Sequence, residues 1–154
     1  GDGPQLTIFR KVPQGEERLS DGALARSGDL VQIIYRSGGL RYGAILSVDG
    51  RGAVTQHLPV EGEKAVSLAA KDTLDYAYEL DDAPRRERFV FVAADILFDL
   101  QEIIGQLNAG STLASTAELH YLLKTLDGAE CAHPAKTGLR NAMWRSPGFH
   151  EIMK

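Results

Sequence analysis

Two neighbouring segments with alternating apolar residues constrain the fold of this chain more than any other feature. In residues 30–36, Val31, Ile33 and Tyr35 occupy every second position, and residues 42–48 repeat the pattern from Tyr42 onward. A spacing of two places side chains on one face of a β-strand. Asp49-Gly50-Arg51-Gly52 follows, a sequence that suits a tight turn, and residues 53–58 can then form the returning strand. The sequence therefore predicts a β-hairpin here.

Four further segments have the composition of short strands: residues 6–12, 66–68, 74–80 and 89–93. In the third, Leu74, Tyr76, Tyr78 and Leu80 alternate with polar or small residues, which predicts one buried and one exposed face. Residues 89–93 are apolar at every position, as expected of a central strand buried on both sides. We expect a mainly β domain with about six or seven strands, either sandwich-like or a partly closed barrel.

Residues 96–127 change to helical spacing and predict two amphipathic helices. Asp99 and Glu102 form the pattern of a capping box in the first helix, and Ser115 and Glu118 repeat this pattern at the start of the second. A short third helix is expected over residues 137–144, so that two or three helices form a C-terminal extension. The apolar positions that carry the prediction are Ile96, Leu97, Leu100, Ile103, Ile104 and Leu107, then Leu119, Leu122, Leu123 and Leu126.

The length of 154 residues suits one domain over 1–154, with a β core at 5–95, helices at 96–127 and a weakly structured or short-helix tail at 128–154. A net charge of −4 gives no reason to expect nucleic acid as a partner. No apolar run reaches the length of a membrane span, so we expect no membrane insertion of this fragment. The opening residues Gly1 to Pro4 are typical of a cut piece, which leaves room for a membrane anchor in the full-length protein.

Residues with recognisable chemistry are few. Cys131 and His133, with His120 and His150 elsewhere in the C-terminal part, come closest to a metal motif. A zinc site needs four ligands in paired spacings, so we predict no metal and no cofactor. A hydrolase would have to use His57 or the region of Cys131 and His133, but no Gly-x-Ser-x-Gly elbow is present and no catalytic residue is predicted.

Two other groups of residues have a functional and a structural interpretation. The acidic residues of 79–82 precede the arginines of 85–88; they could bind calcium or act as acid and base, but such runs are typical of a solvated turn with local ion pairs. The tyrosines on the predicted strand faces either pack in the core or line a binding groove. With Trp144 near the end of the chain, they are the candidate binding residues: Tyr35, Tyr42, Tyr76, Tyr78 and Trp144.

Several segments together resemble a bacterial domain family of unknown function. These are Gly28-Asp29 with the strand after it, Arg41 to Gly52, Val54 to Pro59, Tyr76 to Asp82 and Glu87 to Phe89, so that the similarity covers about residues 6–107. The family's motif has a structural content: a turn at Gly28-Asp29, a hairpin turn at Asp49-x-x-Gly52 and a strand end at Pro59. Its members are often the extracytoplasmic part of anti-sigma-factor-like or caspase-like peptidase proteins, and the resemblance implies the same setting here.

We therefore expect a non-catalytic sensory or protein-interaction module of a bacterial regulatory or envelope protein, binding through a strand edge or the groove beside the sheet. The resemblance favours a periplasmic or other extracytoplasmic location. The single cysteine, Cys131, excludes an internal disulfide and leaves a cytoplasmic location open. A hydrolase is the alternative hypothesis, and a structural module that associates with itself is the second alternative.

Overall fold

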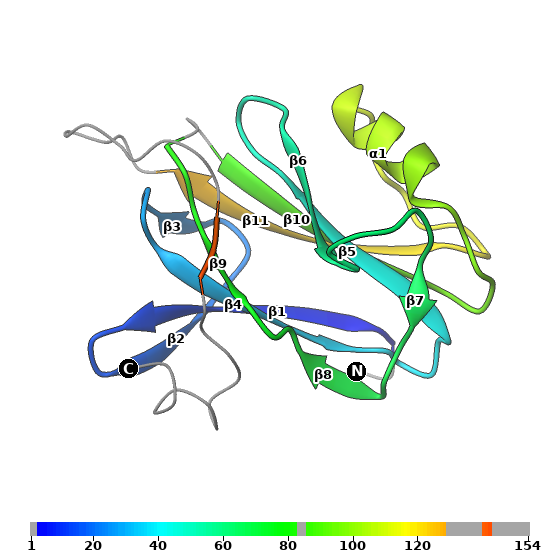
Figure 1. The fold of residues 1–154 in the computed structure, drawn as a ribbon, viewed down its shortest axis with the longest axis horizontal. Coiled ribbons are helices and arrows are strands. Elements are labelled where there is room, and N and C mark those ends of the chain that lie inside the picture. The colour runs from blue at the N-terminus through cyan, green and yellow to red at the C-terminus, as the bar shows by residue number, and fades with distance from the viewer. Residues whose placement is uncertain (1–2, 83–85, 129–139, 143–154) are drawn as a thin grey trace.

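The computed structural model describes residues 3–82, 86–128 and 140–142, and most of these lie in two β-sheets packed face to face (Figure 1). Sheet A has the strand order β12-β9-β4-β1-β2, with β8 paired to β4. Its strands are β1 (Gln5–Val12), β2 (Gly15–Leu19), β4 (Leu30–Arg36), β8 (Lys71–Thr73), β9 (Ala77–Glu79) and β12 (Arg140–Ala142). The predicted mainly β fold is confirmed, but the expected six or seven strands are too few, because the described residues form two six-stranded sheets.

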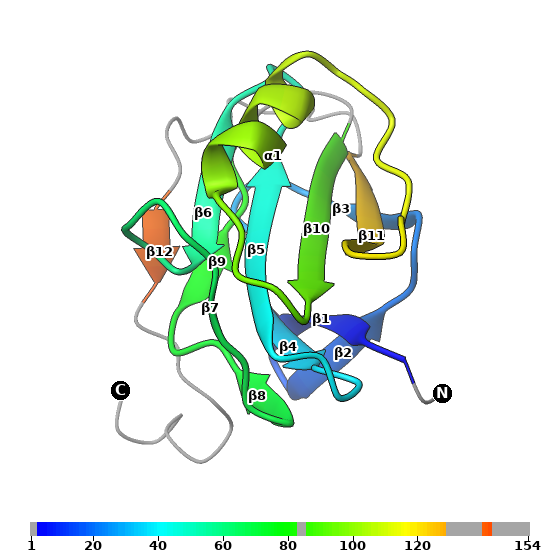
Figure 2. The same cartoon turned by 90° about the vertical axis from the view of Figure 1, so that its right-hand side faces the viewer.

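Sheet B has the order β3-β11-β10-β5-β6, with β7 paired to β5. Its strands are β3 (Ala23–Ala25), β5 (Tyr42–Val48), β6 (Val54–Leu58), β7 (Val66–Ser67), β10 (Arg86–Ala94) and β11 (His120–Gly128). The helix α1 (Leu100–Asn108) lies on the outer face of this sheet against β5 and β6 (Figure 2), and its apolar side chains pack with residues of β5 and β10. Pairing is antiparallel except between β3 and β11.

The predicted hairpin is confirmed as β5 and β6. Asp49 organises its turn: the backbone N–H of Gly52 donates to the Asp49 carbonyl, and the Asp49 carboxylate accepts hydrogen bonds from the N–H groups of Arg51 and Ala53 at 2.8 and 2.9 Å. Gly52 has a φ of 88°, a conformation that side chains with a Cβ rarely adopt. The turn therefore depends on the acidic residue at its start and the glycine near its end.

β10 is the predicted central strand, and it lies between β5 and β11. Phe89 and Phe91 point into the space between the sheets, where they pack with residues of β1 and β4. Val90 and Val92 point the other way and pack under α1. Both faces of β10 are therefore buried, which explains why its sequence is apolar at successive positions.

The first predicted helix forms, but it is shorter than expected. It begins at Leu100, and Ile96 and Leu97 precede it as exposed residues. The expected capping box is absent, because the Asp99 side chain makes no cap hydrogen bond and instead pairs with Lys64 Nζ at 2.7 Å. Of the predicted apolar stripe, Leu100, Ile103 and Leu107 are buried.

The second predicted helix is wrong, because residues 120–128 form strand β11. Alternate residues of this segment pack on opposite sides: Leu122 and Leu126 belong to the core between the sheets, whereas Tyr121 packs under α1. Pairing with β10 over eight registered positions satisfies the backbone in place of helical hydrogen bonds. The spacing of these leucines is compatible with a helix or a strand. The strand forms because β10 offers backbone groups with which it can pair.

Ser115, which was predicted to cap that helix, does accept a hydrogen bond from the backbone, as does the neighbouring Thr116, but both lie in a turn before a strand. Thr116 Oγ1 accepts a hydrogen bond from the N–H of Leu119 at 3.0 Å, and Ser115 Oγ accepts one from Tyr121 at 3.0 Å. The third predicted helix is also wrong in part, since residues 140–142 form β12 and pair with β9. The rest of residues 137–144 lies outside the described residues.

Residues 74–80 follow their predicted alternation only in part. Leu74, Tyr78 and Leu80 are buried as expected, but the strand is confined to β9, and Tyr76 is 40% exposed. The polar strand β2 was not predicted, because only Leu19 at its end is buried.

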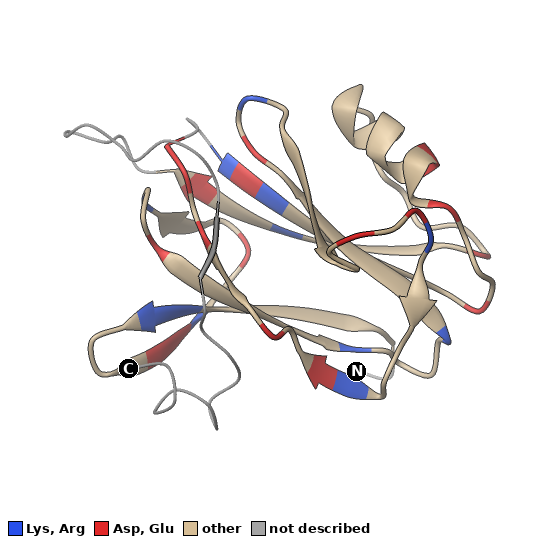
Figure 3. Ribbon diagram, in the orientation of Figure 1, with Lys and Arg blue, Asp and Glu red and all other residues tan. Residues whose placement is uncertain are grey.

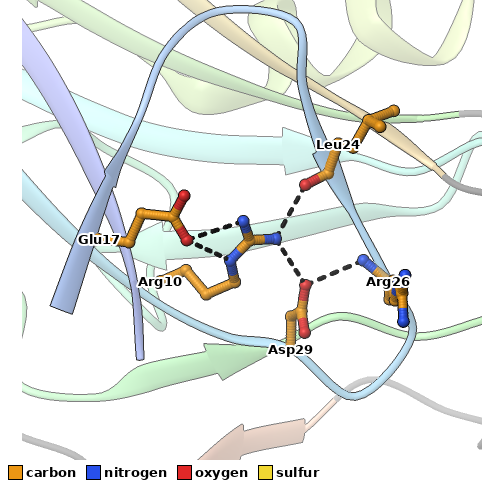
Figure 4. A network of polar contacts seen from close by, with 5 residues as sticks. All are labelled: Arg10, Glu17, Leu24, Arg26 and Asp29. Carbon is orange, nitrogen blue, oxygen red and sulfur yellow. Dashed lines mark hydrogen bonds and ion pairs between the residues drawn. The ribbon is translucent and has the colours of Figure 1, made fainter. Parts of the chain in front are cut away.

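A network centred on Arg10 joins the start of the chain to both sheets (Figure 4). The guanidinium of Arg10, on β1, donates to Glu17 on β2 at 2.9 Å and to the carbonyl oxygen of Leu24 on β3 at 2.8 Å. It also pairs with Asp29 at 3.1 Å, and the same Asp29 oxygen accepts the N–H of Arg26 at 2.9 Å. Gly28-Asp29 thus forms the turn into β4 that the sequence motif implies, and Arg10 holds it.

Two leucines of β11 test its strand conformation. Leu126 is fully buried and Leu123 is 39% exposed, although a helix would place both on one face. We expect Leu126→Ala to lower the free energy of unfolding by about 2–5 kcal/mol and Leu123→Ala to change it by about 0.5 kcal/mol or less. Urea unfolding measures both values. Equal costs would contradict the strand assignment.

Candidate functional site

A pocket of about 140 Å³ opens at the edge of the sandwich, where β6 of sheet B approaches the segment from β8 to β9 of sheet A. This edge faces the viewer's left in Figure 2. Its volume is close to that of a cavity that holds one benzene molecule. The lining residues are His57, Leu58, Val60, Asp72, Thr73, Leu74, Asp75 and Tyr76.

Backbone pairing holds both walls of the pocket in place. On one side, Leu58 is registered with Ile45 of β5 at the end of β6. On the other side, Thr73 is registered with Ile34 of β4, and the N–H of Leu74 donates to the carbonyl of Ile33 at 2.9 Å. The pocket is therefore built between two sheets whose strands are anchored on central neighbours.

The lining carries two carboxylates, Asp72 and Asp75, and contains no lysine or arginine. Acidic and basic residues are otherwise mixed along the strands, and β8 itself carries one of each (Figure 3). Lys71, the residue before Asp72, lies on the opposite face because neighbouring strand residues alternate. The local charge of the pocket is therefore negative.

His57 belongs to the pocket lining and also to the interior of the sandwich. It is only 9% exposed, its Nε2 lies 2.7 Å from Ser47 Oγ, and its ring meets the ring of Tyr78 edge-on at a centroid distance of 4.4 Å. Burial lowers the pKa of His57 to about 3, because the imidazolium would lose its hydration. No described residue forms a hydrogen bond with Nδ1, the other ring nitrogen.

Behind His57 lies a cluster of four buried polar residues, which we call the polar cluster: Ser47, His57, Tyr78 and Glu87. Three come from β5, β6 and β10 of sheet B, and Tyr78 comes from β9 of sheet A. The Tyr78 hydroxyl donates to Glu87 Oε2 at 3.2 Å and lies 3.5 Å from Thr55 Oγ1. The cluster is thus a polar link between the two sheets.

Burial raises the pKa of Glu87 to about 8, although hydrogen bonding to Ser47 works in the opposite direction. The nearby carboxylates Asp49 and Asp81 add to the increase through like-charge repulsion. Burial also raises the pKa of Tyr78. At neutral pH the cluster therefore holds a largely protonated carboxyl group and a neutral imidazole.

The contact between Ser47 and His57 has the distance of a nucleophile and its base, but its surroundings do not suit catalysis. Ser47 has no exposed surface, so no substrate reaches its hydroxyl. In a catalytic triad an acid orients the second imidazole nitrogen, whereas here Glu87 contacts Tyr78 and Ser47. The geometry is that of a buried polar contact within the core.

The structure separates the tyrosines that the sequence proposes as binding residues. Tyr35 is buried, and its ring centroid lies 5.3 Å from that of Phe91. Its hydroxyl oxygen accepts a hydrogen bond from the N–H of Ala69. Tyr42 is half-buried, with the Arg41 guanidinium 5.3 Å from its ring centroid. Tyr76 lines the pocket and Tyr78 belongs to the polar cluster, so only these two lie near one site.

The other predicted candidates have mixed outcomes. His57 occupies the pocket, whereas Trp144, Cys131, His133 and His150 lie outside the described residues. Asp82 pairs with the distant Arg51 at 2.8 Å, and this contact lowers the pKa of Asp82. Ser47, Asp72, Asp75 and Glu87 were not identified from the sequence as residues of the site.

Comparison with models of known families, with curated proteins and with solved structures found no match. Among the described residues, no three His, Cys, Asp or Glu side chains gather as metal ligands. Within the same part of the chain, no helix combines the length and apolar character needed to cross a membrane. The case for function therefore rests on the pocket itself.

The pKa shifts of Glu87 and His57 predict that the free energy of unfolding is greatest, and nearly constant, between pH 4.5 and 6.5. The pKa of Glu87 rises from 4.5 to about 8 on folding, so the free energy of unfolding falls as pH increases across that interval. The pKa of His57 falls from 6.5 to about 3, so the free energy of unfolding decreases as pH drops across that interval. Between pH 4.5 and 6.5 the two slopes offset each other, at about 1.4 kcal/mol per pH unit each.

Glu87→Gln keeps the hydrogen-bonding shape and removes the ionisation. We expect this variant to lose the decline in stability between pH 6.5 and 8, measured by urea unfolding at a series of pH values. Glu118→Gln, at an exposed position, serves as the control and should keep the wild-type profile. Parallel profiles for wild type and Glu87→Gln would contradict the assigned pKa shift.

Proposed function

We propose that this chain is a non-catalytic protein-interaction module and that the pocket beside β6 is its recognition site. The observation that carries the proposal is the pocket, lined by residues of both sheets and containing a buried imidazole with one unpartnered nitrogen. Recognition pockets combine apolar walls with a few placed polar groups, and Leu58 and Leu74 supply such walls here. A protruding side chain or terminal group of a partner fits a site of this size.

The rigid construction of the site supports binding over a reaction. Each wall is tied into a sheet, and His57 is held by Ser47 and by the ring of Tyr78. Such preorganisation lowers the entropic cost of binding. In contrast, Ser47, whose hydroxyl would serve as the nucleophile, has no exposed surface.

The resemblance noted in the sequence supports a sensory role in a bacterial regulatory or envelope protein, with this module on the extracytoplasmic side. A two-sheet core of this size is stable without disulfides, which is compatible with the periplasm as well as the cytoplasm. We propose the extracytoplasmic setting on the pattern of Gly28-Asp29, Asp49 to Gly52 and Pro59, each of which has the predicted turn or strand-end role.

Site-specific photo-crosslinking in cells that express the full-length protein tests the recognition site. A photoreactive residue at Val60, which is exposed at the pocket mouth, should crosslink a defined partner. The same residue at Leu24, which is also exposed and lies on β3, is the control and should not. Adding Tyr76→Ala should reduce the Val60 product. Equal crosslinking from both positions would contradict a specific site at the pocket.

The 2.7 Å contact between Ser47 and His57 favours a hydrolase as the second candidate. A fluorophosphonate probe, which labels activated serines, decides between the two functions. We expect no labelling of the folded protein, because Ser47 is inaccessible. Labelling that disappears in Ser47→Ala would establish the hydrolase and overturn the binding proposal.

A further inference from the structure

We infer that the pocket beside β6 binds a cationic nitrogen group, an alkylammonium or a guanidinium, with Asp72, Asp75 and His57 as its polar contacts. This inference rests on the proposed function for the location of the site and adds the chemical class of the ligand. Its evidence comes from the charge of the lining, the free nitrogen of His57 and the size of the pocket.

The charge of the lining selects for a cation. Asp72 and Asp75 are the ionisable lining residues besides His57 and Tyr76, and no lysine or arginine shares the pocket with them. One Asp72 oxygen accepts the N–H of Thr73 at 2.8 Å, which orients the carboxylate beside the pocket. An anionic ligand would meet two negative charges there, whereas a cation gains charge-assisted hydrogen bonds.

His57 gives an independent indication that a polar ligand binds. Its ring is more than nine-tenths buried and lines the pocket, yet Nδ1 has no partner among the described residues. Nδ1 is not among the solvent-inaccessible unpartnered atoms of the described residues, so it is open to the pocket, where a ligand atom can pair with it. Because burial keeps the ring neutral, an N–H donor selects the tautomer in which Nε2 donates to Ser47 and Nδ1 accepts.

The size and the remaining walls match the end of one basic side chain. About 140 Å³ accommodates a guanidinium or a short alkylammonium, and a folded element of a partner would not enter. Leu58 and Leu74 offer apolar contacts for methylene groups next to the charge. The half-exposed ring of Tyr76 adds an aromatic face of the kind that attracts cations.

The same chemistry reaches the pocket either as a lysine or arginine side chain of a partner protein or as a free small amine. Titration of the ¹⁵N-labelled 154-residue chain, followed by NMR and calorimetry, separates the two sources. The probes are n-butylammonium and agmatine as free cations, and N-acetyl-arginine amide and an arginine-containing peptide as protein-like cations. The citrulline analogue of the peptide is the matched neutral probe.

We expect the cationic probes to shift the amide resonances of His57, Leu58, Val60 and residues 72–76, and the citrulline peptide to leave them unchanged. Asp72→Asn with Asp75→Asn should weaken binding by about tenfold or more. Asp95→Asn with Asp127→Asn removes the same charge at exposed positions outside the lining, and should keep the affinity within about twofold. Tighter binding of the peptide than of agmatine identifies a protein side chain as the ligand.

A third variant tests the role of the imidazole. In His57→Gln the amide can occupy the position of Nε2 beside Ser47 but supplies no atom in place of Nδ1, and thermal unfolding shows whether the variant stays folded. We expect a loss of affinity in the folded variant.

If neutral or anionic probes bind at the pocket and cations do not, the cationic class is wrong while the recognition site stands. If no probe shifts the pocket resonances and Val60 gives no specific crosslink, both proposals fail.

Discussion

The burial of β10 on both faces is the constraint on which the rest of the structure depends. Phe89 and Phe91 fill the space between the sheets, and Val90 and Val92 hold α1 on the outer face. Because the strand alternates, Glu87 is in phase with the two phenylalanines and must also point inward. The backbone register of β10 thus brings a carboxyl group into the core, and the neighbouring strands have to provide its partners. Ser47 on β5 and Tyr78 on β9 do so from opposite sheets.

The polar cluster gives the pocket a fixed floor. A buried carboxyl group without a cation stays protonated and needs hydrogen bonds from its neighbours. The residues that satisfy it also hold His57, since Ser47 contacts Nε2 and Tyr78 packs against the ring. The orientation of the imidazole, and therefore of its unpartnered nitrogen, is set by the core and not by solvent. A site supported in this way loses little entropy when it meets a ligand.

The sequence predicted the parts of the fold in which local pattern and tertiary environment agree. Alternating apolar residues and turn residues predicted the bounds of β4, β5 and β6 to within one residue. They could do so because the alternation within each segment shows which side chains face the core. The pattern fails at β11, where leucines at mixed spacing suit a helix or a strand and pairing with β10 determines which one forms.

At the site, His57 and Tyr76 were identified from sequence, but Ser47 was not, because both faces of β5 are buried and its polar residue is not marked by alternation. Glu87 could have been found from its phase with Phe89, whereas the meeting of Asp72 with His57 depends on how the two sheets approach each other.

The pocket draws its walls from both sheets, so its width depends on the contacts that join them at this edge. Contacts of two kinds lie at this edge: those of Tyr78 with Glu87, Thr55 and His57, and the ion pair from Arg51 in the hairpin turn to Asp82 after β9. The first is buried and the second is at the surface, where a single pair contributes little to stability. The buried contacts that Tyr78 makes with His57 and Thr55 therefore do most to set the spacing between β6 and β9. Because Tyr78 contacts both the pocket residue His57 and the carboxyl group of Glu87, the pocket and the polar cluster share one support in the core.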